Sequence, residues 1–137
     1  MHKYVPLCAA CYALVILAGC NSGPTLAPVK GVLTYKGKAL PNIHLDFEPE
    51  KGDGRPSWGQ TDAQGRFTLE YDIDRKGVLI GKHKVYAKMG SGGEKVPGER
   101  PPASKDLAEF FEKYGGTNSK VIVEIQANTR EVTLAWD

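Results

Sequence analysis

The amino-acid sequence predicts an all-β domain: a seven-stranded antiparallel β-sandwich with one short helix in the loop before its last two strands. Three observations lead to this prediction. Apolar and polar residues alternate in several short segments, turn-forming residues separate these segments, and a single segment carries apolar residues at helical spacing. Alternation with a period of two places the apolar side chains of an extended strand on one face, whereas a helix has a period of 3.6.

The alternation is clearest where Ile43, Leu45 and Phe47 flank His44 and Asp46. Similar patterns occur at 67–71, 85–89, 121–125 and 132–136, and an earlier strand is expected at 29–35. Turn-forming residues lie between strands at 36–38, 62–65 and 127–129. We therefore expect these side chains to face the interior: Ile43, Leu45, Phe47, Phe67, Leu69, Val85, Val123, Ile125, Val132 and Leu134.

The helix is expected at 104–114, with Ser104 as its N-cap and two glycines after its last residue. Its apolar residues fall at i, i+3, i+4 and i+7 and form one stripe: Leu107, Phe110, Phe111 and Tyr114. The stripe could be a docking surface, but so short a helix is stable only when packed. We therefore predict that the stripe belongs to the core.

Two stretches of the chain combine turn glycines with alternating apolar residues. Residues 29–47 read V-K-G-V-L-T-Y-K-G-K-A-L-P-N-I-H-L-D-F, and 59–67 read G-Q-T-D-A-Q-G-R-F. They resemble the carboxypeptidase regulatory-like domain, in which a V-x-G-x-V strand enters a turn and a T-D-x-x-G-x-F hairpin follows. Segments 112–114, 119–123 and 130–136 resemble the second half of small bacterial lipoproteins of this type. The resemblance implies a transthyretin-like fold over 29–137, and such motifs say little about activity.

The first twenty residues differ in composition from the rest of the chain. An apolar run at 5–18 follows Lys3, and Leu-Ala-Gly-Cys stands at 17–20. This segment resembles the signal peptide and lipobox of a bacterial lipoprotein. The run is short for a membrane-spanning helix, which needs about 20 residues. The resemblance implies removal of residues 1–19, a diacylglyceryl group on the Cys20 thiol and attachment to a bacterial membrane. Asn21 slightly favours the outer membrane.

After the lipidated cysteine, residues 20–28 are expected to be a flexible tether, and 29–137 to form one domain. Cys20 would be the only cysteine of the mature chain, so no disulfide is expected within it. Lys and Arg number 18 against 16 Asp and Glu, with no block of one sign, so nucleic acid is not an expected partner.

No catalytic constellation or cofactor site is expected. His44 and His83 have no second ligand at a spacing typical of metal sites. A calcium loop that began at Asp72 would have Lys76 at its fifth position and His83 at its twelfth, where a bidentate Glu is required. We therefore expect solvated or core histidines and an acidic hairpin loop. No serine lies in an activating G-x-S-x-G motif.

Two functions remain open. The first is a non-catalytic, membrane-anchored envelope protein whose domain is a structural or protein-interaction module. The second is a small-ligand binding protein, for a glycan or a peptide, that uses loops 50–58 and 90–102, both rich in Gly and Pro. Trp58 is the candidate binding residue, either as an exposed platform or as a side chain packed over the sandwich edge.

Overall fold

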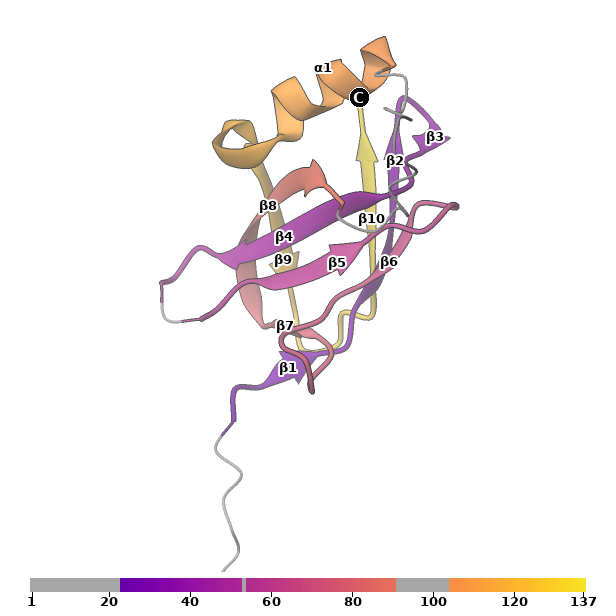
Figure 1. Cartoon of the computed structure of the whole chain (residues 1–137). Coiled ribbons are helices and arrows are strands. Elements are labelled where there is room, and N and C mark those ends of the chain that lie inside the picture. Colours follow the sequence, from indigo (N-terminus) through magenta and orange to yellow (C-terminus); the bar gives the residue numbers. More distant parts are fainter. Residues whose placement is uncertain (1–22, 53, 91–103) are drawn as a thin grey trace, which may run out of the picture.

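The computed structural model describes residues 23–52, 54–90 and 104–137. These residues form ten strands, one α-helix and a short 3₁₀ helix (Figure 1). In chain order the elements are β1 (Leu26–Ala27), β2 (Lys30–Tyr35), β3 (Lys38–Ala39), β4 (Ile43–Pro49), β5 (Ser57–Gln60), β6 (Arg66–Thr68), β7 (Val78–Leu79), β8 (Gly81–Met89), α1 (Lys105–Tyr114), η1 (Gly116–Asn118), β9 (Val121–Ile125) and β10 (Glu131–Trp136). The mostly β architecture with one helix before the last two strands is confirmed.

The longer strands form two sheets. One has the order β5-β4-β8-β9 and is antiparallel throughout. In the other, β2 pairs with β10 and also with β3 and β6. Backbone hydrogen bonds in both directions between Trp58 and Glu70 join β5 to the segment after β6.

The structure differs from the predicted sandwich in strand direction and in strand number. β10 pairs with β2 in parallel, from Glu131 beside Lys30 to Trp136 beside Tyr35. Alternating burial is the same in parallel and antiparallel strands, so the sequence pattern did not specify this direction. Ten strands rather than seven occur among the described residues, because β1, β3 and β7 are two-residue pairings without a pattern of their own.

The predicted interior is largely confirmed. Eight of the ten side chains are buried, with Leu45, Phe47, Leu69 and Val85 completely inaccessible. Val123 and Val132 are only partly buried, although both pack against the core. These two belong to β9 and β10, each of which pairs on one side alone among the described residues.

The helix α1 covers one end of the domain and completes its core, as predicted (Figure 1). Phe110 is completely buried and Tyr114 is 8% exposed, while Leu107 and Phe111 pack partly buried against the core. The Phe110 ring lies 5.4 Å from that of Tyr35 and 5.8 Å from that of Trp136, measured between centroids. The apolar stripe therefore faces the interior.

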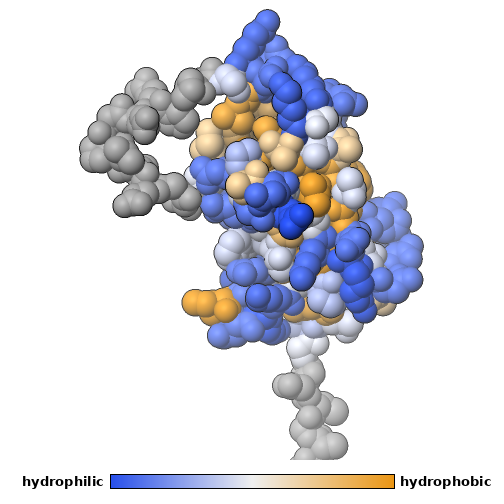
Figure 2. All heavy atoms as spheres, turned by 90° about the vertical axis from the view of Figure 1, so that its right-hand side faces the viewer, coloured by the Kyte–Doolittle hydropathy of each residue, from blue (hydrophilic) through white to orange (hydrophobic). Residues whose placement is uncertain are grey.

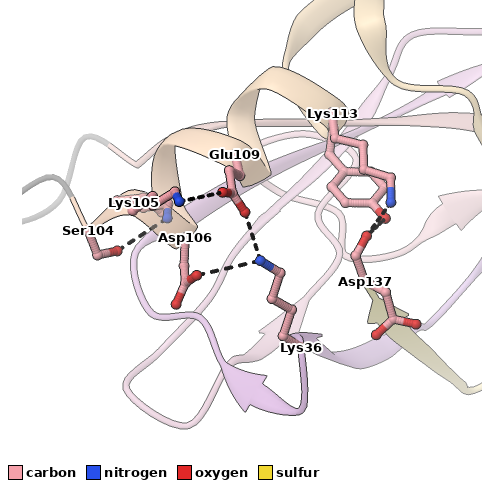
Figure 3. Close-up of polar contacts among 9 residues, drawn as sticks. Lys36, Ser104, Lys105, Asp106, Glu109, Lys113 and Asp137 are labelled. Carbon is pink, nitrogen blue, oxygen red and sulfur yellow. Dashed lines mark hydrogen bonds and ion pairs between the residues drawn. The ribbon is translucent and has the colours of Figure 1, made fainter.

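Polar contacts at both ends of α1 complete its attachment (Figure 3). Ser104 is the N-cap, and its Oγ accepts a hydrogen bond from the Leu107 N–H at 3.2 Å. Lys36, in the turn between β2 and β3, lies 2.7 Å from Oε2 of Glu109. This hydrogen bond raises the pKa of the Lys36 ammonium above its ordinary value. At the other end, the Tyr114 hydroxyl donates to the Asp137 carbonyl at 2.9 Å.

The opposite end, which we call the base, contains β1, β7 and the loop 72–77 (Figure 1). Leu26 pairs with Leu79 and Ala27 with Val78, and Ala27 and Val29 are buried. Backbone pairing therefore begins inside the segment that was expected to be a tether. The sequence 21–28 has few large apolar groups, and the β1–β7 pair forms through contacts that are distant in the sequence.

Candidate functional site

A group of polar and aromatic side chains lies on the outer face of the β5-β4-β8 part of the sheet. Ile43, Leu45 and Phe47 point inward along β4, so the alternation turns His44 and Asp46 outward. Asp46 pairs with Trp58 of β5 on one side and with Tyr86 of β8 on the other. His44 likewise pairs with Lys88. Strand register thus assembles the group from three strands.

Trp58 has a partly exposed indole ring that packs against one neighbouring side chain. Its side chain is 38% exposed, and its ring stacks on the His44 imidazole with 5.6 Å between centroids and 11° between planes. His44 Nε2 lies 3.1 Å from Oδ1 of Asp46, and the other carboxylate oxygen of Asp46 pairs with the Lys88 ammonium. The indole, the imidazole, the carboxylate and the ammonium form one connected row across the sheet.

A groove of about 660 Å³ lies next to Trp58. Its polar lining carries both signs of charge, with Lys30 and Arg66 against Asp62, Glu70 and Glu131. The remaining lining residues are Gly31, Val32, Gln60, Phe67, Thr68, Val132 and Thr133. An aromatic surface beside charged and hydroxyl groups suits a ligand that is both flat and polar.

A smaller hollow of about 440 Å³ lies beside Asp46 on the same sheet and includes Glu48, Tyr86 and Lys88. The Tyr86 hydroxyl donates to Oε2 of Glu48 at 2.5 Å. This hydrogen bond is the main reason that the pKa of Tyr86 is raised above its ordinary value. Tyr86 therefore stays a neutral donor at physiological pH.

The remaining predicted positions have structural roles or lie outside the described residues. His83 is buried, and its Nε2 lies 2.7 Å from the Leu79 carbonyl oxygen, so it is a core histidine. Asp72 accepts hydrogen bonds from backbone N–H groups of its own loop, in agreement with a hairpin loop. In the described part of the chain, no three His, Cys, Asp or Glu side chains are grouped to hold a metal ion.

Cys20 lies outside the described residues, as does loop 90–102 apart from Gly90. Loop 50–58 joins β4 to β5, and its last two residues belong to β5. Trp58 is both partly exposed and packed on a neighbour, and its role in binding stays a prediction.

Sequence reasoning missed the parts that His44 and Asp46 play beside Trp58. Their outward positions follow from the alternation at 43–47, so the sequence pattern alone indicates that His44 and Asp46 share the outer face of β4. Their contact with Trp58 depends on the pairing of β4 with β5, and the sequence pattern predicts no strand at 57–60, because loop 50–58 is expected to extend into that segment.

Comparison with protein-family models, curated proteins and solved structures finds no match to this chain. The resemblance to the carboxypeptidase regulatory-like domain therefore stays a prediction. Within 23–52, 54–90 and 104–137, no helix has the length and apolar character needed to cross a membrane.

Proposed function

We propose that the protein is an envelope lipoprotein, anchored to a bacterial membrane through Cys20, whose transthyretin-like β-domain is a non-catalytic interaction module. The interaction part of this proposal is supported by Trp58, which is partly exposed on the outer face of the β5-β4-β8-β9 sheet and stacks on His44. The anchor is supported by the lipobox-like sequence at 17–20.

Trp58 has the properties of a residue that contributes strongly to an interface. Tryptophan is enriched among the residues that dominate binding energy, and a side chain that is already immobilised loses little entropy on binding. Stacking on His44 supplies that immobilisation. The charged groups around the groove supply a polar rim of both signs, which favours a protein partner of mixed charge.

Crosslinking in the native envelope tests this proposal. A photoreactive residue at Thr68, which lines the groove, should form a specific adduct with a partner protein, and Trp58→Ala should abolish that adduct. Ile122→Ala is the matched control, because Ile122 is 45% exposed on β9 at the far edge of the same sheet. An adduct that is equally abundant in both variants contradicts the assignment of the interface to Trp58.

A small ligand, a glycan or a peptide, is the second candidate. The groove favours it, because about 660 Å³ lies within the usual 300–1,000 Å³ range of small-ligand pockets. Titration with soluble oligosaccharides and muropeptides, followed by tryptophan fluorescence, separates the two candidates. Saturable quenching that disappears in Trp58→Ala would assign the groove to a small ligand and displace the protein-partner proposal. Unchanged emission together with the Trp58-dependent adduct would favour the protein partner.

A further inference from the structure

The base of the domain carries an exposed apolar residue. Ile73, in the loop 72–77, is 96% exposed, the highest value among the large hydrophobic side chains of the described residues. Ile80, the single residue between β7 and β8, is 43% exposed and lines a groove of about 760 Å³ with Pro24 and Leu79. Figure 2 shows a hydrophobic group, in orange, that projects sideways from the lower part of the domain.

The loop around Ile73 is held by internal hydrogen bonds. Oδ1 of Asp72 accepts from the backbone N–H groups of Asp74 and Arg75 at 3.1 and 2.8 Å. Its Oδ2 accepts from Nε of Arg75 at 2.8 Å and also pairs with Nη2. These bonds bridge across Ile73 and fix it at the outer edge of the loop. The loop charges also balance, since its two acidic residues, Asp72 and Asp74, are matched in number by Arg75 and Lys76.

The chain enters the domain at this same end. Leu26 and Ala27 pair with Leu79 and Val78, which directly follow the loop. Six residue steps separate Leu26 from Cys20, and a fully extended chain covers at most about 20–22 Å in that number of steps. The polar layer on each side of a bilayer is about 5–8 Å thick, from the difference between the total and the hydrocarbon thickness. A lipid on Cys20 therefore keeps the base close to the bilayer surface.

We propose that loop 72–77 places Ile73 in the lipid interface as a second, apolar contact between the domain and the membrane. The inference rests on the proposed lipid anchor. The anchor makes the second contact intramolecular, so that one apolar side chain finds lipid at a high effective concentration. Because the loop charges balance, the contact depends on apolar transfer and not on anionic lipid. It orients the domain with α1 away from the bilayer, and with β5, which carries Trp58, between α1 and the base.

An environment-sensitive fluorophore on Ile73→Cys tests this proposal in the mature lipidated protein, reconstituted in phosphatidylcholine vesicles. The Cys20 sulfur carries the diacylglyceryl group and does not react with the probe, so the introduced thiol is the only reactive one. Lys105→Cys is the matched control, because its native side chain is 90% exposed and lies on α1 at the other end of the domain. We expect a blue-shifted emission at position 73 that lipid-borne nitroxide quenches, and a water-like emission at 105.

The outcomes separate the contact from the anchor. If the mass of the protein shows the lipid on Cys20 but the emission at position 73 is water-like, the membrane contact is overturned and the anchor is not. Probe on Cys20, or protein that does not float with the vesicles, overturns the anchor and the contact together. A blue shift that disappears when the protein is diluted in lipid assigns the loop to a second copy of the chain and also overturns the contact. An equal blue shift with and without phosphatidylglycerol supports the apolar origin.

Discussion

Replacing Phe110 by alanine should strongly destabilise the domain. Its side chain is completely buried and lies within 6 Å, between ring centroids, of Tyr35, Phe111, Tyr114 and Trp136. Truncating a buried Phe costs about 3–5 kcal/mol, out of the roughly 5–15 kcal/mol that stabilises a small domain. For a domain of this size the loss lowers the Tm by about 10 °C or more.

Thermal and urea unfolding followed by circular dichroism measures this loss. Phe111→Ala removes the same number of atoms from a partly buried position one residue further along α1, so it should cost clearly less. Lys105→Ala, at an exposed position, should change the free energy of unfolding by at most about 1 kcal/mol. A Phe110→Ala variant that melts with the parent protein would refute the core role of α1 and make its stripe an interaction surface.

Two further predictions concern the sheets. Gly31→Ala places a methyl group within 2.6 Å of the Val132 carbonyl oxygen and should lower the free energy of unfolding in urea by about 1–3 kcal/mol. Gly52 has open space around it, so Gly52→Ala should change this free energy little. Equal losses in the two variants would contradict the close packing at Gly31. The hydrogen bond from Tyr86 to Glu48 raises the pKa of Tyr86, so it contributes to the free energy of unfolding below about pH 10. This stabilisation is lost as the pH rises through the raised pKa of Tyr86. Glu48→Gln should therefore lower the Tyr86 titration midpoint in NMR, and an unchanged midpoint would show that the carboxylate is not the cause.

Local sequence patterns predicted the features of the fold that depend only on residues close together in the sequence. The period of two at 43–47 identified the buried face of β4, and the i, i+3, i+4, i+7 spacing identified α1 and its inner face. Ser104 is the N-cap that its residue type indicated. These features need no knowledge of which strand lies next to which.

Features that depend on distant pairings were not predicted. β10 lies beside β2, although the two strands are far apart in the sequence, and it runs parallel to β2. The alternation of apolar and polar residues is the same for either strand direction, so it did not predict this pairing. The pairing of β1 with β7 involves two residues on each strand and carries no sequence signal. The stacking of Trp58 on His44 likewise follows from the β4–β5 register, so the candidate site was recognised only through Trp58 itself.

The mass of the mature N-terminal peptide is the most direct test of the lipid anchor, and the orientation of the domain and the membrane contact both depend on that anchor at Cys20. Intact and peptide mass spectrometry of protein purified from the membrane of the producing bacterium should show an acylated N-terminus at Cys20. Cys20→Ser should accumulate as an uncleaved, unacylated precursor. An unmodified N-terminus, a start at any other residue or retention of residues 1–19 would contradict the lipoprotein proposal.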